Sequence, residues 1–233
     1  MRSDRYFSIL FVLLLLNHLW AGAFRDLYEW WYLLSKPALL VSIIVYFLWQ
    51  CRNFPHQLRN WLALGFVFSL AGDVLLMFQD KELFFLLGLA AFMLAHVAYI
   101  LAFRLWVYDN HEVPLLKRHP WMAFALMLYG VGFFQLIEGG LGAMKIAVIA
   151  YMAVILLMAL MALNRHRKVS RRGFALVLMG ALAFLLSDSI LAYNKFEEPV
   201  PFGGIWIMTT YAFAQWAIMM GGIIELRGIA RRG

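Results

Sequence analysis

Charged residues and cysteine are scarce in this 233-residue chain. Only 14% of the residues are charged and 64% are hydrophobic, whereas about a quarter of the residues in soluble domains are charged. With a mean hydropathy of +0.78, this composition excludes a soluble globular enzyme and a disordered tail. The single cysteine, Cys51, excludes an internal disulfide, a disulfide-stapled secreted domain and a cysteine-based metal cluster.

Motifs of several common enzyme classes are also absent. The sequence has no Gly-x-Ser-x-Gly nucleophile elbow, no glycine-rich phosphate loop and no His-Glu-x-x-His zinc helix. We therefore expect no cofactor and no metal. The net charge of +7 is more typical of basic cytoplasmic loops in a membrane protein than of nucleic-acid binding, so we expect no nucleic-acid partner.

Eight apolar segments are present, separated by charges, prolines and glycines. Each has close to the roughly 20 residues that a transmembrane helix requires. We predict an all-α polytopic membrane protein, a single bundle of eight transmembrane helices. The first segment resembles a signal-peptide core but has no convincing cleavage site, so we expect it to be retained. The predicted spans lie near residues 6–23, 30–50, 60–78, 83–107, 121–137, 142–163, 173–193 and 204–225.

Most of the 20 lysines and arginines fall on alternate connections and on the two termini. The positive-inside rule then places both termini in the cytoplasm. The short loops favour a bacterial inner membrane. We expect the basic run from Arg165 to Arg172 to set this topology and to contact anionic lipid headgroups.

A weak internal repeat relates the first four spans to the last four. Its offset of 115 residues is the separation of Asp73 and Asp188, and it favours a 4+4 parallel repeat. The same offset aligns Gly65 with Gly180, Gly88 with Gly203 and His96 with Tyr211.

Two carboxylates, Asp73 and Asp188, lie inside otherwise apolar spans. Each costs roughly 2.5–3.5 kcal/mol near the middle of an inserted helix. At 1.5 Å per residue, both lie about 20 Å from the cytoplasmic face, at one level in the outer half of the membrane. One possibility is that they hold the third and seventh spans in place through a structural hydrogen-bond network. The other is that they form a functional site.

Lys36 precedes Pro37 in the second span, and the 14 residues from Pro37 to Gln50 are too few to cross the bilayer. The span therefore begins earlier, and a proline beside a lysine at membrane depth indicates a polar cavity. The alternative is a lysine that snorkels to the interface. Further candidate binding residues are His96 and Tyr99, which share one helix face, together with Asn17, Ser187, Asn194, Tyr211 and Gln215.

Four short motifs in this order resemble the YhhN-type lysoplasmalogenase family of eight-span membrane proteins. They are Ser35-Lys36-Pro37, Leu70-Ala71-Gly72-Asp73, His96-x-x-Tyr99 and Ser187-Asp188. The resemblance implies hydrolysis of the vinyl ether bond of a lysoplasmalogen, which yields a fatty aldehyde and a glycerophospho-base. It also implies that Asp73 and Asp188 are the acidic site residues.

Two buried carboxyl groups suit this chemistry on independent grounds. A vinyl ether is activated when an acid protonates its β-carbon, and water then captures the resulting oxocarbenium ion. One carboxyl group can donate the proton while the other stabilises the cation and orients the water. The sequence does not assign these roles. We expect Lys36 near the lipid phosphate, with His96 and the tyrosines orienting the substrate.

Two other functions remain open. Intramembrane Asp, Lys and His residues also mark proton and ion pathways, so a coupled transporter is one alternative. A metal-dependent intramembrane lipid amidase is the other. Ion flux without aldehyde release favours the transporter, whereas bound metal and sensitivity to chelators favour the amidase.

Overall fold

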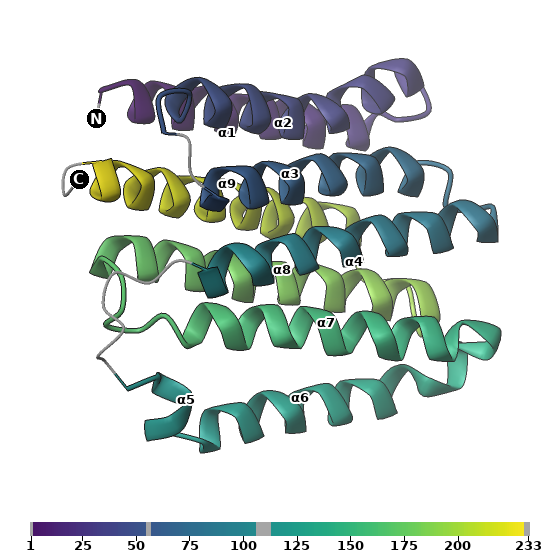
Figure 1. Cartoon of the computed structure of the whole chain (residues 1–233). Coiled ribbons are helices and arrows are strands. Elements are labelled where there is room, and N and C mark those ends of the chain that lie inside the picture. The colour runs from purple at the N-terminus through teal and green to yellow at the C-terminus, as the bar shows by residue number, and fades with distance from the viewer. Residues whose placement is uncertain (1, 55–56, 106–112, 231–233) are drawn as a thin grey trace.

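A computed structural model describes residues 2–54, 57–105 and 113–230, and within these ranges the chain folds into helices without strands (Figure 1). The last two residues of the predicted span 83–107 lie outside the described residues. The long helices are α1 (Arg2–Ala23), α2 (Glu29–Gln50), α3 (Gln57–Leu76), α4 (Glu82–Leu105), α6 (Trp121–Ile137), α7 (Lys145–Leu163), α8 (Arg171–Phe196) and α9 (Gly203–Ala230).

The prediction of an all-helical protein with eight spans is confirmed, because eight described helices are long and apolar enough to cross a membrane. The boundaries differ at several ends. The last helix runs five residues past the predicted end at residue 225, and the first begins at Arg2 rather than residue 6. The short helix α5 (Leu115–Arg118) and two 3₁₀ turns, η1 (Glu138–Gly140) and η2 (Gly142–Met144), were not predicted.

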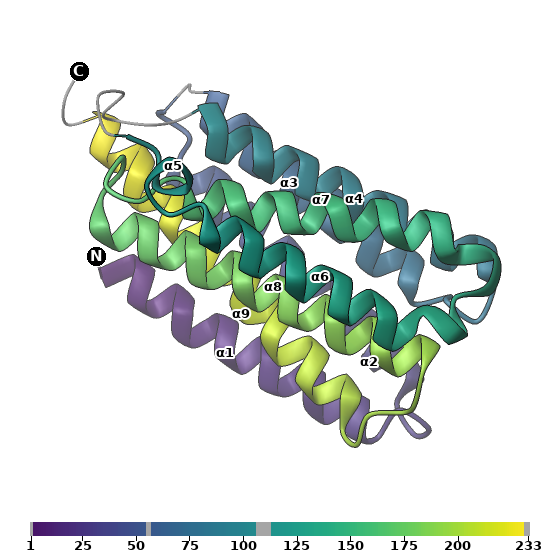
Figure 2. The ribbon, with the colours of Figure 1, turned by 90° about the horizontal axis from the view of Figure 1, so that it is seen from below.

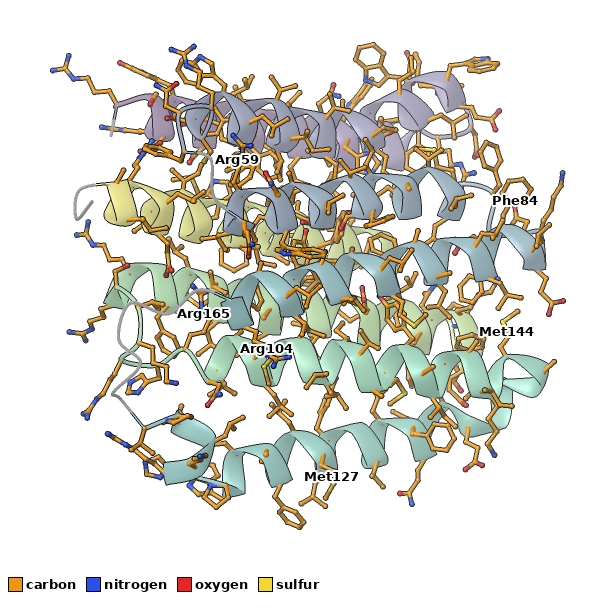
Figure 3. All side chains as sticks on the ribbon, in the orientation of Figure 1. Arg59, Phe84, Arg104, Met127, Met144 and Arg165 are labelled. Carbon is orange, nitrogen blue, oxygen red and sulfur yellow. The ribbon has the colours of Figure 1, made fainter. Side chains whose placement is uncertain are left out.

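The long helices run side by side, and both termini lie at one end of the bundle (Figure 1). We call this the terminal end and the opposite one the far end. Arg104 and Arg165 lie toward the terminal end, whereas Phe84 and Met144 lie at the far end (Figure 3). An even number of spans requires the termini to share one side. That this side is the cytoplasm stays a prediction.

Helix α9 is the central helix of the bundle and α6 is the peripheral one. The buried face of α9 contacts α8, α3, α2 and α1. Helix α6 packs mainly on α7 and exposes most of its residues (Figure 2). The largest fully buried side chains include Phe47, Phe66, Phe103 and Phe184. They belong to the main hydrophobic core of the bundle.

Helices α3 and α4 approach closely because Gly65 leaves room for an aromatic ring. A Cβ atom on residue 65 would lie 2.2 Å from Cε1 of Tyr99. The glycine therefore lets the Tyr99 ring lie flat against the backbone of α3. From that position its hydroxyl donates to Oε1 of Gln215 on α9, at 2.7 Å.

Ion pairs join the helix ends at the terminal end. Arg227 donates to both carboxylate oxygens of Asp4, at 2.7 and 2.8 Å. Arg165 donates to Glu225 at 2.6 Å and is only 3% exposed. The expectation that Arg165 contacts lipid headgroups is therefore wrong, because the side chain turns inward to a buried carboxylate that the sequence reading overlooked.

Substitution of Gly65 by alanine should destabilise the protein. The new methyl group overlaps the Tyr99 ring, and overpacking of this kind costs about 1–3 kcal/mol. We expect a lower midpoint of thermal unfolding in detergent. The control is Gly132→Ala on α6, where nothing lies within 4 Å of the added atom. An equal midpoint for Gly65→Ala and the wild type would contradict this packing.

Candidate active site

Asp73 on α3 is held by side chains from two other helices. It is 2% exposed, and its Oδ2 accepts a hydrogen bond of 2.7 Å from the Tyr211 hydroxyl on α9. The ammonium group of Lys36, on α2, lies 3.6 Å from its Oδ1. A carboxylate inside an apolar bundle thus has both a hydrogen-bond donor and a cation as partners, as buried charges require.

Asp188 on α8 has a different set of partners. The Tyr151 hydroxyl, on α7, donates to Oδ2, and Nε2 of His96 on α4 lies 3.4 Å from the same oxygen. Nε2 of His96 also lies 2.9 Å from the Tyr151 hydroxyl. Because that hydroxyl donates to Asp188, its oxygen can accept a hydrogen bond from the Nε2–H of His96. The three side chains form one hydrogen-bonded cluster.

Both carboxylates line one cavity, which we call the polar cavity. It extends to the far end of the bundle, because Arg25 and Gln79 from the connections there also line it. Its remaining polar lining residues are Tyr32, Lys36, Ser187 and Tyr211. The polar cavity that Lys36 and Pro37 indicated is therefore present.

A second cavity, the apolar cavity, lies between α4, α6, α7 and α8. Its walls are mainly aromatic and aliphatic, from residues such as Phe85, Phe133 and Leu156. Asp188 lines both cavities, together with Leu76, Phe92 and Leu191. One carboxyl group thus lies where a polar and an apolar compartment meet.

The other candidate residues do not all lie at the polar cavity. Ser187 lines the polar cavity, and His96 lies behind Asp188. Tyr99 and Gln215 form a fully buried pair that lines neither cavity.

Asn17 and Asn194 were expected at the site and lie elsewhere. Oδ1 of Asn17 accepts from the Trp31 indole on the bundle surface, at 3.2 Å. Oδ1 of Asn194 accepts from the backbone amide of Val200, at 2.9 Å, and so holds the connection between α8 and α9. Neither lines the polar or the apolar cavity, because each is engaged by a local partner instead.

The sequence reading missed Tyr151 and Arg25. Tyr151 has a signal in the sequence, because the 115-residue offset that relates Asp73 to Asp188 also relates Lys36 to Tyr151. Lys36 and Tyr151 each contact the carboxylate of their own half of the chain. Arg25 has no comparable signal, since it lies in a connection.

The residues that α4 and α9 contribute contact the carboxylate in the other half of the chain. His96 and Tyr211, which the offset also relates, each contact the carboxylate of the opposite half. This exchange is the arrangement that a 4+4 repeat would produce. The repeat itself stays a prediction.

Among the residues that the structure describes, no group of three or more His, Cys, Asp or Glu side chains is arranged to hold a metal ion. The cluster at Asp188 combines one carboxylate and one imidazole with a phenol. This donor set suits proton transfer and hydrogen bonding.

Comparison with known proteins identifies the family. Residues 31–222 match the YhhN family. The chain belongs to the YhhN family. This match spans all four motifs and both carboxylates, so the resemblance stated from the sequence is confirmed. No solved structure matches the chain.

Curated proteins that are similar to this chain carry an enzyme name. The human protein named lysoplasmalogenase TMEM86A is 32% identical over 171 residues, which cover 72% of this chain and 67% of the relative. Human lysoplasmalogenase TMEM86B is 31% identical over 194 residues, covering 83% of this chain and 76% of the relative. Pig lysoplasmalogenase TMEM86B is 31% identical over 153 residues, covering 65% of this chain and 58% of the relative.

The pair of Lys36 and Asp73 should be energetically coupled. Lys36→Met leaves the buried carboxylate without its cation, whereas the same change beside Asp73→Asn removes no charge pair. We expect Lys36→Met to lower stability more in the wild type than in Asp73→Asn, with a coupling of about 0.5–3 kcal/mol. Thermal unfolding of the two single variants and the double variant in detergent measures this. Additive effects would contradict the pairing.

Proposed function

We propose that this protein is a membrane-embedded hydrolase that cleaves the vinyl ether bond of lysoplasmalogens. The products are a fatty aldehyde and a glycerophospho-base. The observation that carries the proposal is the position of Asp188, where the apolar and polar cavities meet. The names of the curated relatives support the same reaction.

The two cavities match the two ends of a lysoplasmalogen. Its single alkenyl chain suits the apolar cavity, whose walls are hydrocarbon, and its polar headgroup suits the cavity that contains Arg25 and Lys36. The vinyl ether joins these two ends of the molecule. With each end in its own cavity, the scissile bond lies beside Asp188 and faces Asp73.

The reaction requires one acid, one water molecule and a polar group that stabilises the transient cation. A carboxyl group donates its proton to the β-carbon, and the ether oxygen supplies the electrons that form the oxocarbenium ion. Water adds to the α-carbon and returns a proton to the carboxylate. The hemiacetal hydroxyl then loses its proton as the carbon–oxygen bond to glycerol breaks, and the glycerol oxygen gains one.

Each of the two carboxylates is held by its own set of neighbours. Lys36 and Tyr211 hold Asp73, and Tyr151 and His96 hold Asp188. One of the pair donates the proton while the other stabilises the cation and positions the water, as paired carboxyl groups do in glycosidases. Burial away from bulk water strengthens this electrostatic stabilisation.

The shape of the site favours an enzyme over a transporter. Toward the terminal end, the bundle interior holds buried aromatic side chains, among them Phe47, Phe66 and Phe103. Two buried polar pairs also lie there, Tyr99 with Gln215 and Arg165 with Glu225. Neither pair lines the polar cavity, whereas a conduit for ions would require a polar path that continues from it. A site closed on one side suits a lipid that enters and leaves through the other. With the termini in the cytoplasm of a bacterial inner membrane, this site faces the outer leaflet.

The test is product analysis with purified protein. We expect the wild type to release a fatty aldehyde from a 1-alkenyl lysophospholipid and no fatty acid from the matching 1-acyl lipid. In D₂O the aldehyde should carry one deuterium at the carbon next to the carbonyl, because that carbon receives the proton. Mass spectrometry resolves both results.

Asp73→Asn and Asp188→Asn should each lower the rate at least 100-fold, since each removes a carboxyl group that the reaction uses. Asp80→Asn is the matched control, because Asp80 is exposed in a connection and lines neither cavity. Full activity of either intramembrane variant would remove that residue from the mechanism. Ion flux in proteoliposomes without aldehyde release would favour the transporter, and loss of activity on chelation with restoration by metal would favour a metalloenzyme.

A further inference from the structure

Arg25 occupies a position that the proposed mechanism does not use. It lies in the connection between α1 and α2 at the far end, is exposed, and lines the polar cavity. It also lines an adjoining cavity with His18 and Tyr32. Two cavities thus meet at one guanidinium group.

The guanidinium of Arg25 is held over an aromatic ring. Its Cζ lies 4.9 Å from the centre of the Tyr32 ring. Such a contact orients the planar group and leaves its N–H donors free at the edge. Among the described residues, Arg25 forms no ion pair, so its charge is available to a ligand.

Lys36 is the other basic residue lining the polar cavity, and its charge is already engaged. Its ammonium group lies 3.6 Å from Oδ1 of Asp73. An anion that binds there would compete with a buried carboxylate. The sequence analysis expected Lys36 near the lipid phosphate, whereas the structure offers Arg25 as the uncommitted cation.

We propose that Arg25 binds the phosphodiester of the substrate headgroup. The inference rests on the proposed function, which places the ether bond beside Asp188 and the headgroup in the polar cavity. A phosphodiester accepts two parallel hydrogen bonds from a guanidinium, and such charge-assisted pairs are among the stronger polar contacts in proteins. Arg25 therefore selects phospholipids over neutral ether lipids.

The experiment compares two substrates that differ only in the phosphate. One is a 1-alkenyl glycerophosphoethanolamine and the other is the 1-alkenyl glycerol with the same chain. Arg25→Gln should lower kcat/KM for the phospholipid about 10- to 100-fold, mainly through KM. It should leave the value for the neutral lipid unchanged within about twofold. Arg25→Lys should retain part of the preference, because it keeps the charge but loses the planar fork.

Lys81→Gln is the matched control. It makes the same change of charge at the same end of the bundle, but Lys81 lies beside Phe84 and lines neither cavity. We expect it to behave as the wild type on both substrates. This control separates a local contact from a general electrostatic effect.

Competition distinguishes a lipid headgroup from free phosphate as the bound anion. Glycerophosphoethanolamine should inhibit the wild type more strongly than inorganic phosphate at equal concentration, and Arg25→Gln should weaken that inhibition. Equally strong inhibition by inorganic phosphate would overturn the assignment to the headgroup.

The outcomes separate this inference from the proposed function. Equal losses on both lipids would overturn the inference by showing a structural or membrane-anchoring role for Arg25. Unchanged kinetics on the phospholipid would also overturn it, and vinyl ether hydrolysis by the wild type would still support the proposed function. Absence of aldehyde from both lipids with wild-type protein would instead contradict the proposed function.

Discussion

The structure depends on holding two carboxylates, Asp73 and the partly buried Asp188, inside an apolar bundle. An unpaired charge in this environment is too costly to retain, so each aspartate requires partners from neighbouring helices. Asp73 takes Lys36 from α2 and Tyr211 from α9, and Asp188 takes Tyr151 from α7 and His96 from α4. With the aspartates on α3 and α8, these contacts fix the relative positions of six helices.

The same requirement explains why the site has a polar and an apolar side. Helices α2, α3 and α9 contribute the cation and the tyrosine around Asp73, and the polar cavity opens between them and the far-end connections. Apart from the hydroxyl groups of Tyr129 and Tyr151, helices α6 and α7 line the apolar cavity beside Asp188 with hydrocarbon. A molecule with one long hydrocarbon chain and one charged headgroup fits both sides at once. An ion or a soluble metabolite would not fit the apolar side.

Composition and segment lengths were sufficient to predict the fold class, because eight apolar segments with short connections leave few alternatives to a helical bundle. The cost of burying Asp73 and Asp188 was enough to single them out, and the proline beside Lys36 indicated the polar cavity. The composition and the segment lengths do not show which face of each helix packs against its neighbours. Whether Tyr151 faces a carboxylate or lipid depends on the rotation of α7 about its own axis.

Polar residues near helix ends were the least predictable. Asn17 and Asn194 carry the same type of side chain as many ligand-binding residues, yet one binds a surface indole and the other a loop amide. Arg165 belongs to a basic run that was predicted to contact lipid headgroups, but its side chain turns inward and binds Glu225. The partner of each of these side chains depends on which groups lie within reach after the helices have packed. That partner cannot be identified from a single sequence.

The most direct test of the account is an experimental structure with a saturated 1-alkyl lysophospholipid, which has no double bond to protonate. If the two carboxylates form the active site, the ether oxygen of this lipid lies within reach of both Asp73 and Asp188, with the chain in the apolar cavity and the phosphate at the far end. A ligand whose ether bond lies away from both carboxylates, or whose chain fills the polar cavity, would contradict it.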